Sequence, residues 1–207
     1  MINCNDISTR LRRLVDKRNY FFKDTSRSDA MSYLKTKTDF QGLATPEILA
    51  LEEKINKAFP DDFKTFLSVF GKNCGELFCN GQDFRPHEFN NYQEWAKELI
   101  EQHGIASFLT EKSFVFSFHQ GYNFYFFDGG KNDDSVYFYM EGEPEPVKVY
   151  ECFADLVESD LLELEQFNEE AQSSDGQFLT ISQGRLTMTW PAQHEKISPR
   201  QIGDRYI

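Results

Sequence analysis

Alternating aromatic residues between positions 113 and 140 constrain the fold more than any other feature. The stretches 114–118 (FVFSF) and 122–126 (YNFYF) repeat with period two, which is typical of β-strands. Residues 136–140 (VYFYM) alternate in the same way, and 147–150 forms a fourth strand or an edge. Short connections between successive strands predict an antiparallel meander.

The loop of the first hairpin decides which side chains share a face. A two-residue loop, Gln120-Gly121, would mix aromatic and polar residues on both faces. A three-residue loop, His119-Gln120-Gly121, puts Gly121 at the left-handed position that such loops favour. This second register is our prediction, and it places six aromatic residues on one face: Phe114, Phe116, Phe118, Tyr122, Phe124 and Phe126.

Helical periodicity surrounds these strands. Amphipathic patterns predict helices over 7–18, 45–58, 60–70, 91–103 and 151–169. Thr45 is the expected N-cap of the second of these and Asn91 of the fourth, whose buried side we expect to include Trp95. Helices before and after a meander make the fold class α+β. We also expect a short strand around 77–79, and a hairpin of 177–181 with 185–190 across Ser182-Gln183-Gly184, followed by an extended tail.

The charge is concentrated in the middle of the chain. Residues 45–170 hold 9 Lys and Arg against 26 Asp and Glu, a net charge of −17, whereas 1–44 carries +4 and 171–207 carries +1. This shift predicts a core domain at 45–170, a basic helical extension at 1–44 and a C-terminal hairpin and tail at 171–207. The basic helix could pack on the acidic body, touch a membrane surface or bind a partner, and we favour packing.

Composition excludes several classes of function. The net charge of −12 and pI near 4.8 argue against direct nucleic-acid binding, because phosphate contacts need Lys and Arg. No apolar run suits a transmembrane helix, and residues 1–20 do not have the apolar core of a secretory signal. We therefore expect a cytoplasmic protein with no membrane partner.

Motifs for catalysis, metal binding or cofactor binding are absent. The four histidines have no ligand spacing, and no nucleophile elbow or phosphate-binding glycine loop occurs. The cysteines, Cys4, Cys74, Cys79 and Cys152, do not form the paired clusters of a zinc site, so we expect reduced and mostly buried thiols. The acidic loop 128–134 does not have EF-hand spacing. We predict no enzymatic activity, no metal and no cofactor.

Two motifs resemble the SUKH superfamily, specifically its Smi/Knr-type branch. The first stands here as Ile48 and Leu51-Glu52, then 59–67 (FPDDFKTFL), then Gly71 and Gly75. It departs from the family pattern at Phe59 for Leu, at Phe63 for Tyr, and at 72–74. The second stands as 125–129 (YFFDG), 136–138 (VYF) and 152–156 (CFADL), with Cys152 for Ser. The order and spacing of these motifs together cover about 120 residues.

The resemblance implies an α+β fold without catalytic residues. In bacteria such proteins are similar to immunity proteins that bind and block toxins delivered between cells, and in fungi a similar domain is a scaffold in cell-wall signalling. An acidic protein suits a basic toxin, such as a nuclease. We predict an immunity protein, with a regulatory scaffold as the alternative, and leave the oligomeric state open. Acidic residues in predicted loops are the candidate partner contacts: Asp83, Glu88, Asp133, Asp134, Glu141, Glu143 and Glu145.

Overall fold

A computed structural model of the chain describes residues 1–17, 20–22, 27–78, 84–173, 178–182, 185–189 and 200–202. Its contacts divide the chain into two units. The first unit comprises residues 1–4, 41–73 and 82–158, and the second comprises 5–40, 74–81 and 159–207. Each unit has its own β-sheet.

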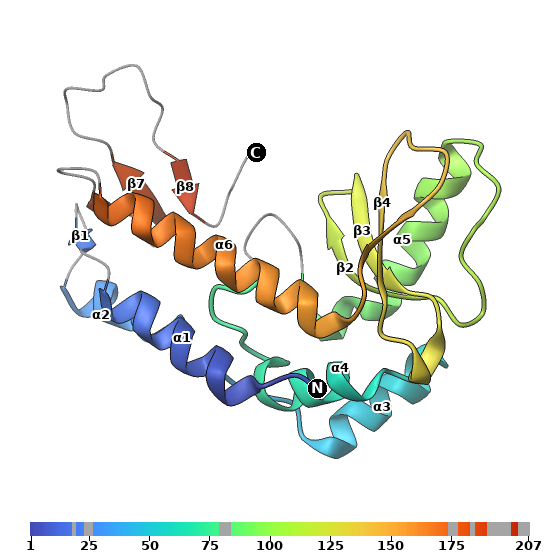
Figure 1. The fold of residues 1–207 in the computed structure, drawn as a ribbon, viewed down its shortest axis with the longest axis horizontal. Coiled ribbons are helices and arrows are strands. Elements are labelled where there is room, and N and C mark those ends of the chain that lie inside the picture. Colours follow the sequence, from blue (N-terminus) through green and yellow to red (C-terminus); the bar gives the residue numbers. More distant parts are fainter. Residues whose placement is uncertain are drawn as a thin grey trace. The chain divides into compact units, whose positions relative to one another are not determined.

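The sheet of the first unit is the predicted meander. Strands β2 (Phe114–His119), β3 (Asn123–Phe127), β4 (Val136–Met140) and β5 (Val147–Tyr150) lie in the order β2-β3-β4-β5. Every neighbouring pair is antiparallel. Figure 1 labels β2, β3 and β4 of this sheet. Together with the helices around it, this sheet confirms the α+β fold class.

The predicted hairpin register is wrong. Phe118 pairs with Phe124 and His119 with Asn123, so the three residues between the strands are 120–122. A β-bulge then shifts the register between Val115 and Ser117. As a result, the aromatic side chains divide between both faces of the sheet.

Phe114 and Phe127 are paired and share one face, which also carries Phe116. Phe118 and Phe124 share the other face with Phe126. The predicted register requires that only one face of the hairpin is buried. Residues 114–118 of β2 are instead buried on both faces, so the position of the aromatic residues does not determine the register.

Helices α3 (Thr45–Ile55) and α4 (Asp61–Phe70) belong to the first unit and come before its sheet in the chain. The N-cap of α3 is Ala44 rather than Thr45, and the Glu47 carboxylate accepts the Ala44 N–H at 2.7 Å. The helix ends earlier than predicted because Asn56 is left-handed, with φ of 55°. Helix α4 follows Pro60 and ends at Gly71, as predicted.

The core of the first unit is built on aromatic rings around Phe63 of α4. The Phe63 side chain is fully buried, and its ring centroid lies 5.1 Å from that of Phe153 and 5.3 Å from that of Phe127. Five further rings lie within 6.1 Å of it: Phe59, Phe84, Phe89, Phe114 and Phe116. Edge-to-face and tilted pairs of this kind stabilise beyond their buried area.

Helix α5 (Phe89–Gln102) follows the short helix η1 (Pro86–Glu88) and packs along β2. It begins two residues before the predicted cap, Asn91, and ends before Gly104, which is left-handed with φ of 66°. The Gln93 amide accepts the Val115 N–H at 2.9 Å and donates to the Val115 carbonyl at 2.6 Å. This side chain therefore satisfies backbone groups at the edge of β2.

The predicted strand at 77–79 is wrong where the structure describes it. Leu77 and Phe78 lie in a turn, and Cys79 lies outside the described residues. Phe78 is buried and left-handed, with φ of 59°. Its N–H donates to the buried Asp160 carboxylate at 2.7 Å, which supports an unusual backbone conformation.

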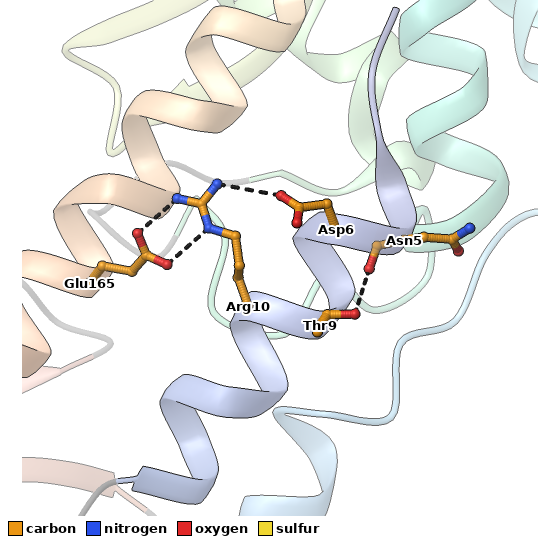
Figure 2. Close-up of polar contacts among 5 residues, drawn as sticks. All are labelled: Asn5, Asp6, Thr9, Arg10 and Glu165. Atoms are coloured by element: carbon orange, nitrogen blue, oxygen red, sulfur yellow. Dashed lines mark hydrogen bonds and ion pairs between the residues drawn. The ribbon is translucent and has the colours of Figure 1, made fainter.

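The second unit contains most of α1 (Cys4–Lys17), α2 (Arg27–Thr36) and the larger part of α6 (Phe153–Ser173). The predicted N-terminal helix is thus confirmed, and its apolar residues Ile7, Leu11, Leu14 and Val15 are buried. Arg10 binds Glu165 of α6 through two hydrogen bonds of 2.7 and 2.9 Å, as Figure 2 shows. This bidentate ion pair joins α1 to α6.

A second sheet has the order β1-β6-β7-β8. Strands β6 (Phe178–Ser182) and β7 (Arg185–Thr189) form the predicted C-terminal hairpin, although Ser182 pairs with Arg185 and so belongs to the strand. Strands β1 (Tyr20–Phe22) and β8 (Arg200–Ile202) were not predicted. Because β1 pairs with β6 in parallel, the N-terminal and C-terminal segments share one sheet.

Candidate functional site

A surface pocket of about 350 Å³ lies in the first unit, between α5 and the tip of the β2–β3 hairpin. We call it the α5–hairpin pocket. Helix α5 contributes Trp95, Glu98, Leu99 and Gln102 to it, and the hairpin contributes Phe118, Gln120 and Gly121.

Helical spacing explains the contribution of α5. Residues 95, 98, 99 and 102 are three or four positions apart, so they form one stripe on the helix surface. On the neighbouring stripe Tyr92, Ala96 and Ile100 are buried. The pocket therefore lies at the border between the buried and the solvent-facing sides of α5.

The hairpin contributes through a tight left-handed turn. Gln120 and Gly121 have φ values of 43° and 90°, and the Tyr122 N–H donates to the His119 carbonyl at 2.8 Å. Two consecutive left-handed residues are the signature of a type I′ turn, which glycine adopts without strain. The turn holds Gln120 and Gly121 at the pocket wall.

Trp95 is the main apolar surface of the pocket. Its side chain is 43% exposed, although we predicted it on the buried side of the helix. The indole lies edge-on to Phe118, with ring centroids 6.0 Å apart, and 5.7 Å from Tyr92. Because Tyr92 and Phe118 are both buried, they support the indole as a rigid platform at the surface.

Electrostatics in and around the pocket are mainly negative. Among the described residues that line it, Glu98 is the one ionisable residue. Glu94, Lys97 and Glu101 are exposed on the same helix. A lining of this composition carries no nucleophile and no acid–base pair, and it suits binding of a cationic or aromatic group.

A family model described as SMI1 / KNR4 family (SUKH-1) matches residues 42–159, which is more than half of the chain. The chain belongs to the SMI1/KNR4 family. The matched region contains both motifs in which the sequence resembled SUKH proteins and the whole α5–hairpin pocket. No curated protein matches the chain significantly.

Within this SMI1/KNR4 region, three of the predicted partner residues occupy one turn. Glu141, Glu143 and Glu145 are exposed between β4 and β5. Glu141 lies 3.0 Å from His103, which follows α5 directly. Burial, reinforced by Glu141 and Glu143, raises the pKa of Tyr139.

Two further candidates lie at the other end of β4, before Val136. Asp133 accepts the Ser135 N–H at 2.9 Å, and the hydrogen bonds from Ser135 lower the pKa of its carboxyl. Asp134 accepts the Phe153 N–H at 3.2 Å and so stabilises the start of α6. Five strand residues separate these two from the 141–146 turn, a span of about 17 Å, so the acidic candidates do not form one patch.

Glu88 and Asp83 complete the set. Glu88 ends η1, where its carboxylate accepts a hydrogen bond from the Asn91 amide and lies 3.6 Å from His87. Asp83 lies outside the described residues. Whether any of the seven contacts a partner stays a prediction, but Glu88, Asp133, Asp134 and Glu141 also have structural partners within the chain.

Metal-ligating side chains and thiols also occur among the described residues. Among them no group of three or more His, Cys, Asp and Glu side chains could hold a metal ion. Cys4 is buried, and burial raises the pKa of its thiol, whereas Cys74 and Cys152 are half-buried. The helices that the structure describes include none long and apolar enough to cross a bilayer.

Proposed function

We propose that this SMI1/KNR4 protein is a non-catalytic immunity protein of the bacterial cytoplasm, which binds a basic toxin domain and occludes its active site. The observation that carries the proposal is the charge of the segment 45–170, which contains most of the family match. Residues 45–170 have a net charge of −17, whereas the segments on either side are weakly positive. Family membership supports binding as the activity, in line with the bacterial relatives that the motifs resemble.

Electrostatics explain how such a protein would select its partner. A negative surface accelerates encounter with a positive one and repels acidic proteins. Enzymes that act on nucleic acids are basic because they bind phosphates, so a nuclease is the partner class that fits best. The exposed turn with Glu141, Glu143 and Glu145 supplies charge at the surface, and Trp95 supplies the aromatic anchor that tight interfaces need.

A regulatory scaffold without a toxin partner is the second candidate. The observation that favours it is the second unit, in which the N-terminal and C-terminal segments share a sheet through β1 and β6. This unit lies largely outside the family match, so it offers a further surface for assembly.

Affinity capture separates the two functions. The tagged full-length chain is incubated with lysate of its source and with a panel of purified basic nuclease toxin domains, at about 50 and about 300 mM salt. Immunity predicts one stoichiometric basic enzyme, weakened as salt rises and inhibited by the chain. Recovery of housekeeping or cell-wall proteins alone would instead support the scaffold.

Paired variants test the charge contribution. Glu143→Gln combined with Glu145→Gln removes two exposed charges, and we expect weaker binding at low salt through slower association. Asp134→Asn is less informative because Asp134 also caps α6. Equal affinity of the double variant and the unchanged chain at about 50 mM salt would exclude the 141–146 turn from the interface.

A further inference from the structure

We propose that the α5–hairpin pocket is a receptor for a single arginine side chain presented by the basic partner. This inference rests on the proposed function only for the source of the arginine, because the recognition chemistry belongs to the pocket itself. Three observations carry it: the exposed indole, the acidic residue Glu98 in the lining, and a glutamine on each wall, Gln102 on α5 and Gln120 on the hairpin.

The indole provides a face for a flat cation. Trp95 is 43% exposed, although it is supported by the buried rings of Tyr92 and Phe118. Guanidinium groups stack on tryptophan more often than ammonium groups do, and the attraction grows as water is excluded. A rigid exposed indole loses little entropy when a ligand binds to it.

The carboxylate provides charge complementarity. Glu98 lies one helical turn after Trp95, so its carboxylate and the indole line the same pocket. No other lining residue in the described part of the chain is charged. A carboxylate beside an aromatic face pairs with the edge of a guanidinium whose plane stacks on the ring.

The remaining lining groups suit the other guanidinium N–H donors. Gln102 of α5 and Gln120 of the hairpin turn both line the pocket, and each side-chain amide has a carbonyl oxygen that accepts hydrogen bonds. Arginine has five N–H donors in a planar fork, whereas lysine has three around one nitrogen. Acceptors on two walls and a flat aromatic surface therefore favour arginine over lysine.

The net charge of −17 across residues 45–170 argues in the same direction. An acidic protein attracts a basic surface, which is rich in arginine and lysine. An aromatic peptide side chain would use the indole and Leu99 but would gain no charge pairing from Glu98.

The test uses the full-length chain and N-acetyl-arginine amide as the probe, with the uncharged isostere N-acetyl-citrulline amide and with N-acetyl-lysine amide for comparison. The indole N–H resonance of Trp95 is followed by NMR in a Trp190→Phe background, which leaves one tryptophan. We expect saturable shifts with the arginine probe, at least about fivefold weaker binding of the lysine probe and no saturation with citrulline.

Variants identify the site. Glu98→Gln is expected to weaken binding of the arginine probe at least about fivefold. The matched control is Glu101→Gln, at an exposed site on the same helix outside the pocket lining, and it should change the affinity less than about twofold. Trp95→Leu is followed through the backbone resonances of Gly121 and is expected to abolish saturation. Equal binding of arginine and citrulline, or equal losses in Glu98→Gln and Glu101→Gln, would overturn the proposal.

The outcome is distinguishable from failure of the proposed function. Arginine binding at the pocket without capture of a basic enzyme would contradict immunity and leave the pocket assignment intact. Capture of an inhibited basic enzyme whose affinity is unchanged by Trp95→Leu and Glu98→Gln would support immunity and overturn the pocket as its anchor.

Discussion

Gln93 is predicted to be the side chain that fixes α5 to the sheet and so shapes the pocket. Its amide pairs with both backbone groups of Val115, a residue with no exposed surface, and also donates to the Phe89 carbonyl at 2.8 Å. Gln93→Ala leaves the Val115 N–H and carbonyl without this partner. Each unpaired buried group costs about 1–3 kcal/mol, so we expect the free energy of unfolding to fall by about 2–4 kcal/mol.

Gln93→Glu separates the acceptor from the donor. The introduced carboxylate still accepts the Val115 N–H but faces the carbonyl oxygens of Val115 and Phe89 without a proton to donate. Folding therefore disfavours its charged form and raises its pKa above the unfolded value, so the variant is destabilised at pH 7. The penalty disappears below about pH 4, where the carboxyl is protonated in the folded and unfolded states alike.

Urea denaturation followed by Trp95 fluorescence in a Trp190→Phe background measures both effects, because Trp95 lies two residues after Gln93 on α5. Glu101→Ala, at an exposed site on the same helix, is the control and should change the stability by less than about 0.5 kcal/mol. A loss below about 1 kcal/mol for Gln93→Ala, or a pH-independent loss for Gln93→Glu, would refute the role of Gln93 as a strand-edge partner.

Three other predictions concern stability. Phe63→Ala should lower the free energy of unfolding, measured by urea denaturation, by about 3–5 kcal/mol because the Phe63 ring contacts seven others. A decrease of less than about 1 kcal/mol would contradict the central place of Phe63 in the core. Glu165→Gln should cost about 1 kcal/mol at pH 7. The hydrogen bond from Arg10 lowers the pKa of Glu165 in the folded protein, so the ion pair stabilises the fold above pH 4.5 and this stabilisation is lost as the pH falls through the folded-state pKa. The free energies of unfolding of the variant and the unchanged chain should therefore become more similar in acid. A difference that does not change with pH would exclude the ion pair as its source. Asp160→Ala should lower the free energy of unfolding by about 1–3 kcal/mol because the Phe78 N–H loses its acceptor. Asp160→Asn keeps an acceptor oxygen and should lower it less. Equal decreases in the two variants would rule out that hydrogen bond as the cause.

Local signals predicted the helices and the meander. Pro60 with two aspartates after it and Gly71 at the end gave the bounds of α4, because they act within one turn of the backbone. Period-two aromatic residues located β2, β3 and β4 for the same reason.

Tertiary effects explain the errors. The bulge between Val115 and Ser117 and the contact of α5 with β2 bury both faces of the hairpin, and no local pattern encodes either feature. Phe78 has strand propensity but adopts a left-handed turn supported by Asp160, which is 82 positions later in the sequence. The strands β1 and β8 are three residues long, too short for a clear period-two pattern, and β1 pairs with β6 at the other end of the chain.

The candidate site was the least predictable part. Trp95 lies beside the buried stripe of α5, and its partial exposure depends on tertiary packing that helical periodicity does not encode. Gln102 and Gln120 carry no sequence signal, because amides are common on any surface. The one relevant sequence signal is the tight Gln120-Gly121 turn, which locates the hairpin tip 18 residues after Gln102. In the structure this tip lies beside the end of α5.

Neutralisation in cells tests the central claim most directly. The basic enzyme recovered by affinity capture is expressed under tight control in a bacterial host, alone or together with the full-length chain, and viable cells are counted after induction. Immunity predicts that the enzyme alone kills and that the chain restores growth, whereas Trp95→Leu combined with Glu98→Gln restores it less. An enzyme that is harmless alone, or one that kills equally in the presence of the chain, would contradict the account.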